Sequence, residues 1–365
     1  MIEFDQKFKR IQALLAEHNL NALLLRRASS FAWATGGAAS YVNTATTNGE
    51  AALLITPTGR YLITNNIEAT RLEKEEKLVA QGWGLHVVPW YEVQDAVTRM
   101  TAGFRLGADG PYPGATDLSA GLARLRANLG PDEITRLREL GQLCAEAMDQ
   151  AIRAVEPGQT EYRIAGKLAY EAERRGVQAI VNLIATDDRV SNFRHPLPTA
   201  KKLDRYAMLV LCGRRRGLVC SITRLVHFGP IPEELRAKAE AVAQVDATFI
   251  TATRPGSTLG NIFEDAMATY ARLGYAGEWK LHHQGGPAGY EPREYVATPG
   301  SAEPVAVGQA YAWNPSITGA KSEDTMLVGE ATNEILTAIS NWPMLPIPVE
   351  GQPEPAMRPA ILEIL

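Results

Sequence analysis

Residues 282–294 read HHQGGPAGYEPRE, and the rest of this 365-residue chain is best understood from this stretch outward. Gly285, Gly286 and Pro287 in succession are incompatible with a helix, so the pattern predicts a turn or an irregular strand. The His, Gln, Tyr, Arg and Glu side chains around them bring hydrogen-bond donors and titratable groups into a small volume, which predicts a functional site. The alternative is a glycine-rich hairpin with ordinary polar surface residues.

Six side chains of this stretch are candidates for substrate binding: His282, His283, Gln284, Tyr290, Arg293 and Glu294. Arg293 is suited to hold a carboxylate through forked hydrogen bonds, whereas Tyr290 either binds substrate or packs in a cleft wall. Adjacent side chains on a strand face opposite ways. We therefore expect His282 and His283 to be structural rather than metal ligands.

The composition limits the class of protein. A hydrophobic content of 45% and a charged content of 21% are those of a soluble globular protein, and 365 residues predict two domains. The net charge of −4 argues against a nucleic-acid-binding surface. No stretch approaches the roughly 20 uninterrupted apolar residues of a membrane span, so we expect no membrane partner.

The cysteines and the first residues bear on the compartment. Cys144, Cys212 and Cys220 form no CxxC pair and indicate no disulfide framework, which fits a reducing, cytoplasmic environment. The start MIEFDQKFKR contains acidic residues and no long apolar core, so it is not expected to be a signal peptide.

The first part of the chain alternates between helical and strand patterns. Apolar spacing predicts a helix over 4–18, a buried strand over 22–25, and a hairpin of 51–56 with 60–64. Further helices are expected over 67–78 and 91–104, with a strand over 85–88 between them. This alternation predicts an α/β domain over residues 1–130.

A break at Leu129-Gly130-Pro131-Asp132 precedes a long predicted helix, because proline suits the first helical position. We place a second domain over residues 131–335. Residues 336–365 are proline-rich and are expected to form a C-terminal tail that lies on the surface in extended form.

The second domain contains an internal repeat. Pro157-Gly158-Gln159-Thr160 recurs 98 residues later as Pro255-Gly256-Ser257-Thr258, and Gly176 recurs at the same offset as Gly274. Each copy predicts a helix that is capped by threonine, ended by glycine and preceded by a longer helix. Two duplicated halves would meet at a pseudo-twofold cleft, a common place for ligands.

The order of these features resembles the pita-bread family of prolidase, aminopeptidase P, methionine aminopeptidase and creatinase. The motifs that carry the resemblance are the two PG-x-T helices, the hairpin CSITR at 220–224, the glycine-rich loop, the bend WNPS at 313–316 and SEDTMLV at 322–328. The resemblance implies an α/β (α+β) fold, with a creatinase-like N-terminal α/β domain before a duplicated pita-bread domain. It also implies a homodimer.

Family peptidases hold two metal ions with two Asp, one His and two Glu. The matching positions here are Ser221, the acid-free stretch 209–213, Gly286 and Asn314, and only Glu323 keeps its acid. A pair of hard divalent ions needs several carboxylates, so we expect no metal and no other cofactor.

Creatinase, a member of the family, lacks the same ligands and works with a histidine in an H-N-P-x-T stretch. This chain has His195-Pro196-Leu197-Pro198-Thr199. The resemblance implies that His195 is the catalytic acid/base and that Glu323 assists it. Arg224 either binds a substrate carboxylate or pairs with Asp324. Thr223 replaces a second creatinase Glu, which argues against creatine itself.

Three functions are therefore open. The first is metal-independent hydrolysis of a C–N bond in a small carboxylate-bearing molecule or dipeptide. The second is a catalytically inactive binding protein, and the third is an Xaa-Pro peptidase with an atypical site. The polar side chains around the glycines favour the first.

Overall fold

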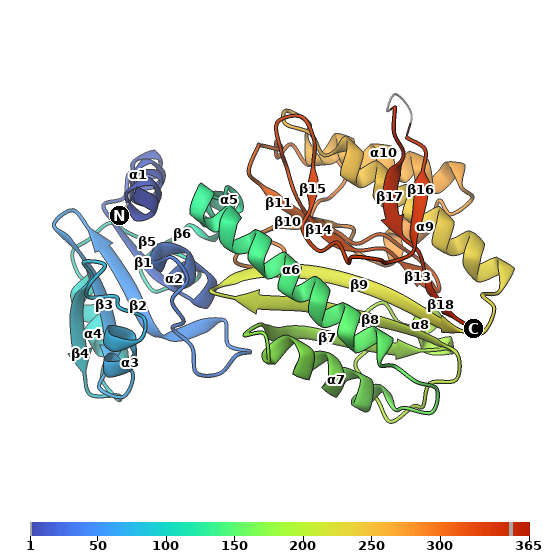
Figure 1. Ribbon diagram of the computed structural model, residues 1–365. Coiled ribbons are helices and arrows are strands. Elements are labelled where there is room, and N and C mark those ends of the chain that lie inside the picture. Colours follow the sequence, from blue (N-terminus) through green and yellow to red (C-terminus); the bar gives the residue numbers. More distant parts are fainter. Residues whose placement is uncertain (1, 350–352) are drawn as a thin grey trace. The chain divides into compact units, whose positions relative to one another are not determined.

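The computed structural model describes residues 2–349 and 353–365, and the chain divides into two compact units (Figure 1). One unit runs to Glu133 and includes Arg216–Leu218, and the other comprises Ile134–Arg215 and Val219–Leu365. The first unit thus ends near the predicted break before Pro131. None of the helices in the described part of the chain has the length and apolar character that crossing a membrane requires.

The first unit is an α/β fold built on one six-stranded mixed sheet, in the order β4-β3-β2-β1-β5-β6. Its strands are β1 (Ala22–Arg27), β2 (Asn48–Thr56), β3 (Gly59–Asn65), β4 (Gly84–Val88), β5 (Leu106–Ala108) and β6 (Thr116–Asp117). Its helices are α1 (Ile2–Glu17), α2 (Ala28–Thr35), α3 (Ala69–Lys74), α4 (Val93–Thr101) and α5 (Ser119–Ala127). The predicted hairpin is confirmed as β2 and β3, and the apolar run at 22–25 is a fully buried central strand.

The second unit contains two four-stranded sheets, ordered β18-β9-β8-β7 and β10-β11-β14-β15. The first sheet is formed by β7 (Gln178–Thr186), β8 (Tyr206–Arg215), β9 (Leu218–Phe228) and β18 (Leu362–Ile364). The second is formed by β10 (Gly285–Ala288), β11 (Ala310–Trp313), β14 (Asp324–Leu327) and β15 (Glu334–Ile335). Along the chain, the short strands β12 (Ser316–Ile317) and β13 (Ala320–Lys321) lie between β11 and β14, and they pair with each other.

The helices of the second unit show the predicted duplication. Long helices α6 (Pro131–Arg153) and α9 (Glu233–Ala252) precede the shorter α7 (Glu161–Glu173) and α10 (Leu259–Arg272). The Thr160 side chain caps α7 by accepting from Arg163 N, and Thr258 caps α10 by accepting from Asn261 N. Such caps satisfy amides that have no partner within the helix. The sequence repeat is therefore a structural repeat.

A buried apolar cluster fixes α9 and α10 against the second sheet. Phe249 of α9 stacks on Trp313 of β11 with ring centroids 4.6 Å apart, and Phe263 of α10 meets Phe249 edge-on. These rings are buried in one cluster with Met326 of β14. Burial of each large side chain contributes about 1.5–3 kcal/mol, so this cluster holds β11 and β14 firmly in place.

The two sheets of the second unit meet where β9 runs beside the segment before β14. Thr223 N donates to Glu323 O at 3.1 Å, which forms an isolated antiparallel bridge. Two residues away on each side, Ser221 N donates to Thr325 Oγ1 at 2.7 Å. The acid of SEDTMLV is thereby held against the hairpin that carries CSITR.

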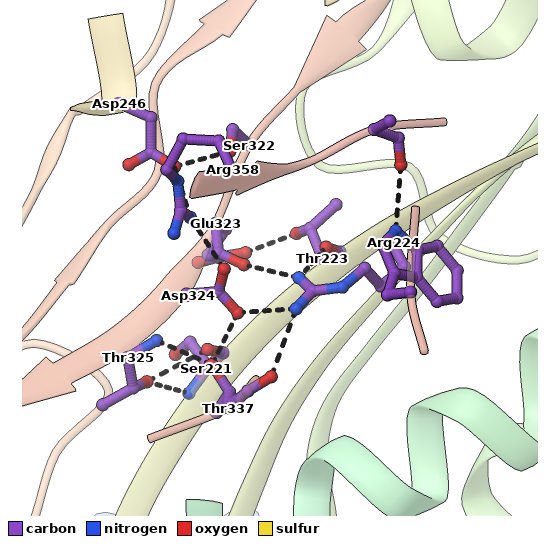
Figure 2. Close-up of polar contacts among 12 residues, drawn as sticks. Ser221, Thr223, Arg224, Asp246, Ser322, Glu323, Asp324, Thr325, Thr337 and Arg358 are labelled. Carbon is purple, nitrogen blue, oxygen red and sulfur yellow. Dashed lines mark hydrogen bonds and ion pairs between the residues drawn. The ribbon is translucent and has the colours of Figure 1, made fainter. Parts of the chain in front are cut away.

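The proline-rich C-terminal segment forms extended strands whose residues are mostly exposed or half-buried, with a few side chains anchored in the core. Strands β16 (Met344–Ile347) and β17 (Ala356–Pro359) form a hairpin, and β18 pairs in parallel with β9. Arg358 of β17 is 2% exposed and contacts Asp246 of α9 at 2.6 Å and Asp324 of β14 at 2.7 Å (Figure 2). A buried arginine needs such partners, and it fixes the segment to the core.

Asp324 lies at the centre of this buried ion-pair network. It also accepts from Arg224 of β9 at 2.8 Å and from the Thr337 hydroxyl at 2.7 Å (Figure 2). The network therefore joins β9, β14, α9 and the C-terminal hairpin at the residue next to Glu323 in the chain.

We predict that Arg358→Met lowers the free energy of unfolding of the second unit by roughly 3–5 kcal/mol, because it leaves two buried carboxylates short of a cation. Urea unfolding, followed by circular dichroism, measures the loss. Arg138→Met is the matched control, since Arg138 pairs with Glu334 at 2.8 Å on the exposed surface and such a pair contributes about 0–1 kcal/mol. Equal losses in the two variants would contradict the central place of the network.

Candidate active site

His195 follows the short helix α8 (Asp188–Asn192) in a segment that is tied down at both ends. On the C-terminal side, the buried Glu161 carboxylate accepts from Thr199 N at 2.9 Å and from the Thr199 hydroxyl at 2.7 Å. On the N-terminal side, Arg194 Nη2 donates to Glu278 at 2.6 Å and to Thr318 Oγ1 at 3.0 Å. These bonds fix the backbone of His195 although its ring is exposed.

Gln284 organises the loop on which His282 and His283 lie. Its Oε1 accepts from the Tyr270 hydroxyl at 2.9 Å, and its Nε2 donates to the His282 carbonyl at 2.7 Å. Asn314 N donates to the Gln284 carbonyl at 3.0 Å. The side chain is fully buried. We had expected Gln284 to bind substrate, but its polar atoms are used within the protein.

The glycines after Gln284 allow β10 to lie close to its neighbours, which confirms the predicted irregular strand. Gly285 has φ 108°, and a Cβ there would stand 2.2 Å from the Ala312 carbonyl oxygen. A Cβ on Gly286 would stand 2.4 Å from the Tyr295 carbonyl oxygen. Gly286 occupies the position of the family's metal-binding histidine. No side chain fits there unless the backbone moves.

Three histidines meet at one point. His195 Nε2 lies 3.0 Å from His282 Nε2, and the rings of His282 and His283 stack with centroids 4.4 Å apart. This corrects the expectation that His282 and His283 face opposite ways. They follow the 3₁₀ turn η1 (Glu278–Leu281) and lie before β10, so the alternation of a regular strand does not apply to them.

The environment keeps these imidazoles neutral. Burial lowers the pKa of His282 to about 2 and that of His283 to about 4. The charge of Lys321 acts in the same direction on both rings, and the charge of Arg293 does so on His283. Burial and Lys321 also lower the pKa of His195. Neutral imidazoles have a lone pair available for a proton or a metal ion.

Glu323 is 2% exposed and lies between two cations. Lys321 Nζ is 2.7 Å from its Oε2, Arg293 Nη2 is 3.0 Å from its Oε1, and the Thr223 hydroxyl donates to Oε2 at 2.5 Å. Burial acts to raise the pKa of Glu323, but the charges of Lys321 and Arg293 and these hydrogen bonds outweigh it and lower the pKa to about 2. Glu323 is therefore ionised at neutral pH.

Arg293 also contacts Ser221, the residue that the resemblance matches to a metal-binding Asp of the family. Its Nη1 donates to Ser221 Oγ at 3.1 Å, and Ser221 Oγ lies 3.2 Å from Cys212 Sγ. Cys212 of β8, within the acid-free stretch 209–213, thus contacts Ser221 of the neighbouring strand β9. Asn314 is buried, and its Oδ1 has no hydrogen-bond partner within the described residues.

The residues at the family's metal positions do not fit a dinuclear metal centre. In place of the acid-rich donor set that hard divalent ions require, these positions offer one carboxylate, one hydroxyl and one amide. Gly286 offers no side chain, and the stretch 209–213 contains no acid. Burial raises the pKa of the Cys212 thiol, which keeps it protonated. Lys321 and Arg293 already neutralise Glu323 and would repel a dication beside it.

Besides Gln284, three of the expected substrate-binding residues do not join this group. Arg224 is buried and is used by Asp324 and by the Thr337 carbonyl at 3.1 Å, so it has the structural pairing that we considered as the alternative. The Glu294 carboxylate accepts from Tyr290 N at 2.8 Å and closes the turn after β10. Tyr290 is 2% exposed and packs inside the unit. The residues that do gather are His195, His282, His283, Arg293 and Glu323.

Lys321 is the functional candidate that the sequence analysis missed. It lies two residues before Glu323, and side chains at that spacing on an extended segment face the same way. That spacing was the available signal. Lys321 and His282 also line a small cavity of about 10 Å³, close to the space that one water needs.

Comparisons with known proteins agree with this architecture. Residues 135–330 match the model of metallopeptidase family M24, and residues 7–169 match the creatinase/prolidase N-terminal domain. An uncharacterized peptidase of Staphylococcus saprophyticus is 24% identical over 60% of this chain, a match that spans 65% of that relative, just under two thirds of its length. The agropine synthesis cyclase of Rhizobium rhizogenes is 32% identical over 36% of this chain and 35% of its own.

Among solved structures, the prolidase from Pyrococcus horikoshii superposes with a TM-score of 0.79. The match covers 92% of this chain and 99% of that one, at 18% identity. The likeness supports the two-part creatinase and pita-bread fold that the sequence predicts.

We predict that the melting temperature difference between wild type and Glu323→Gln shrinks as the pH falls. The folded pKa of Glu323 is about 2, below its ordinary value of 4.5. Its stabilising contribution is therefore fully present above the unfolded value and is lost as the pH falls toward 2. Thermal melts at about pH 7 and about pH 3.5 measure the change.

Glu334→Gln is the matched control, because it removes an exposed carboxylate that pairs with Arg138. Its effect on the melting temperature should stay small at both pH values. An undiminished cost of Glu323→Gln at the lower pH would show that the carboxylate is not held ionised by Lys321 and Arg293.

Proposed function

We propose that this chain, which belongs to metallopeptidase family M24, hydrolyses a C–N bond in a small carboxylate-bearing substrate by a creatinase-like mechanism without a catalytic metal ion. The observation that carries the proposal is the pair of fixed cations beside Glu323. Lys321 and Arg293 lie at 2.7 and 3.0 Å from Glu323, the one acid kept at a family metal position. The neutral His195 lies beside this group.

His195 is proposed as the acid/base. In the tautomer that donates Nε2–H to His282, the Nδ1 lone pair of His195 is left to accept a proton from water. The same 3.0 Å hydrogen bond then stabilises the imidazolium that forms. The proton is returned to the leaving nitrogen, so that His195 ends the cycle in its starting state.

The charge of the site supports an anionic substrate. Lys321, Arg293 and Glu323 together carry a net charge of +1. Of the bonds formed by the described residues, the Lys321 ammonium has one, to Glu323, so it keeps donors for a ligand. We propose that Lys321 and Arg293 bind the substrate carboxylate, and that Glu323 holds both cations in place. The fixed cations also stabilise negative charge that develops on the attacked group.

Three other functions stay open to the same experiments. An inactive binding protein would bind a carboxylate ligand without turnover. One relative is named for ring closure in agropine synthesis, so substrate screens include intramolecular ring closure as well as hydrolysis. Dipeptides with C-terminal proline test the Xaa-Pro peptidase alternative.

We further propose a cytoplasmic homodimer. The three cysteines are free and buried, which supports a reducing compartment. Light scattering at micromolar concentration tests the assembly, and a monomer there would contradict it.

We predict that His195→Ala lowers turnover by about 100-fold or more, which is the usual contribution of general acid–base catalysis. Its melting temperature should stay within a few degrees of wild type, because the ring is exposed. The matched control is His86→Ala, which removes an exposed imidazole of the first unit. Full turnover by His195→Ala would end the proposed mechanism.

We predict that exhaustive chelation leaves turnover unchanged. The enzyme is dialysed against a strong chelator, assayed in its presence, and compared with a metal-dependent prolidase treated in the same way. Loss of turnover that added divalent metal restores would instead favour the peptidase with an atypical metal site.

A further inference from the structure

We propose that His195, His282 and His283 form a binding site for one transition-metal ion of the zinc and copper class, and that a bound ion inhibits the enzyme. The site differs from the family's dinuclear centre, whose positions are occupied here by Ser221 and Asn314 among others. Binding of the ion is independent of the proposed function. The inhibition rests on it.

The positions of the imidazole nitrogens carry this proposal. One ligand atom from each of the three histidines lies within 4.8 Å of the others, and two of the nitrogens are 3.0 Å apart. A zinc ion with Zn–N bonds of about 2.0–2.1 Å in tetrahedral geometry requires nitrogens about 3.3–3.4 Å apart. Ligation therefore requires the rings of His195 and His283, which are both exposed, to rotate until the three nitrogens reach that spacing.

A second observation concerns the protonation of the His282 ring. The buried Nδ1 of His282 has no hydrogen-bond partner among the residues that the structure describes. The lack of an acceptor at Nδ1 among them therefore opposes the tautomer that carries the proton on Nδ1. That tautomer leaves the Nε2 lone pair of His282 to bind the ion.

The donor set selects the kind of ion. Three neutral imidazoles suit Zn²⁺, Cu²⁺ and Ni²⁺, whereas Mg²⁺ and Ca²⁺ require oxygen ligands. The nearby carboxylate of Glu323 is already bonded to Lys321, Arg293 and Thr223 and is not available as a fourth ligand. The fourth position is therefore left to water or to a substrate atom.

Inhibition follows from the limited lone pairs of His195. A neutral imidazole has one lone pair, so when Nε2 of His195 binds the ion, the proton lies on Nδ1, and Nδ1 cannot accept a proton from water. The ring rotation that ligation requires also breaks the 3.0 Å bond to His282. The proposed acid/base is then lost while the ion is bound, and it is recovered when the ion is removed.

Calorimetric titration of the full chain with zinc chloride tests the site. We expect one ion per chain, and an affinity that falls by more than about tenfold in His282→Ala and in His283→Ala. The control is the double variant His18→Ala/His86→Ala, which removes two exposed histidines of the first unit. It should bind as wild type does. No binding by wild type, or equal binding by the triad variants, would overturn the proposal.

Turnover with and without zinc then tests the regulation separately. We expect zinc to abolish turnover of wild type, a chelator to restore it, and His283→Ala to keep a larger fraction of its own zinc-free activity. Stoichiometric binding without loss of turnover would overturn the inhibition and leave the binding site standing. Zinc binding by a protein with no turnover on any substrate would refute the proposed function alone. Turnover that rises with zinc would refute both the inhibition and the metal-independent mechanism.

Discussion

The structure of the second unit depends on one buried carboxylate. Glu323 lies at the bridge between β9 and the segment before β14, where its backbone joins the two sheets and its side chain holds Lys321 and Arg293. An ionised carboxylate without partners in this place would cost several kcal/mol. The two cations and the Thr223 hydroxyl offset that cost, and the charge of Lys321 also lowers the pKa of the neighbouring His195, His282 and His283.

Under the proposed function, this arrangement would explain how a fold that holds metal ions in family peptidases can be kept without them. In family peptidases, several acids offset the charge of two dications. In this chain, one acid lies between two cationic side chains, so opposite charges again offset one another. Their chemistry differs, because fixed cations can bind and polarise an anionic substrate but provide no metal-bound water. A nearby base must then activate the water, and we propose His195, an exposed histidine next to this group, for that role.

The sequence predicted the fold well because its signals are local. The Thr160 and Thr258 caps, Pro131 at the start of α6 and the glycines at 285 and 286 each act through their own backbone. Their order along the chain was enough to reveal the duplication and the resemblance to a known family.

The site was harder to predict, because it depends on contacts between residues far apart in the chain. Strand alternation gave the wrong orientation for His282 and His283, since the turn before them breaks the regular geometry. Residue type alone could not tell which of Arg224 and Arg293 lies at the site. In the structure, Arg224 pairs with Asp324, whereas Arg293 pairs with Glu323. Arg358 showed no signal within a proline-rich segment, because its partners Asp246 and Asp324 lie in distant elements.

The central claim is that Lys321 and Arg293 stand where a member of this family would otherwise hold metal ions. Anomalous diffraction from crystals grown with zinc tests it most directly, since the signal locates each ion independently of any assay. We predict no anomalous peak within about 2.5 Å of the Glu323 carboxylate, the distance expected for a bonded divalent ion. A pair of peaks bridged by Glu323, with the Lys321 and Arg293 side chains displaced, would contradict the claim.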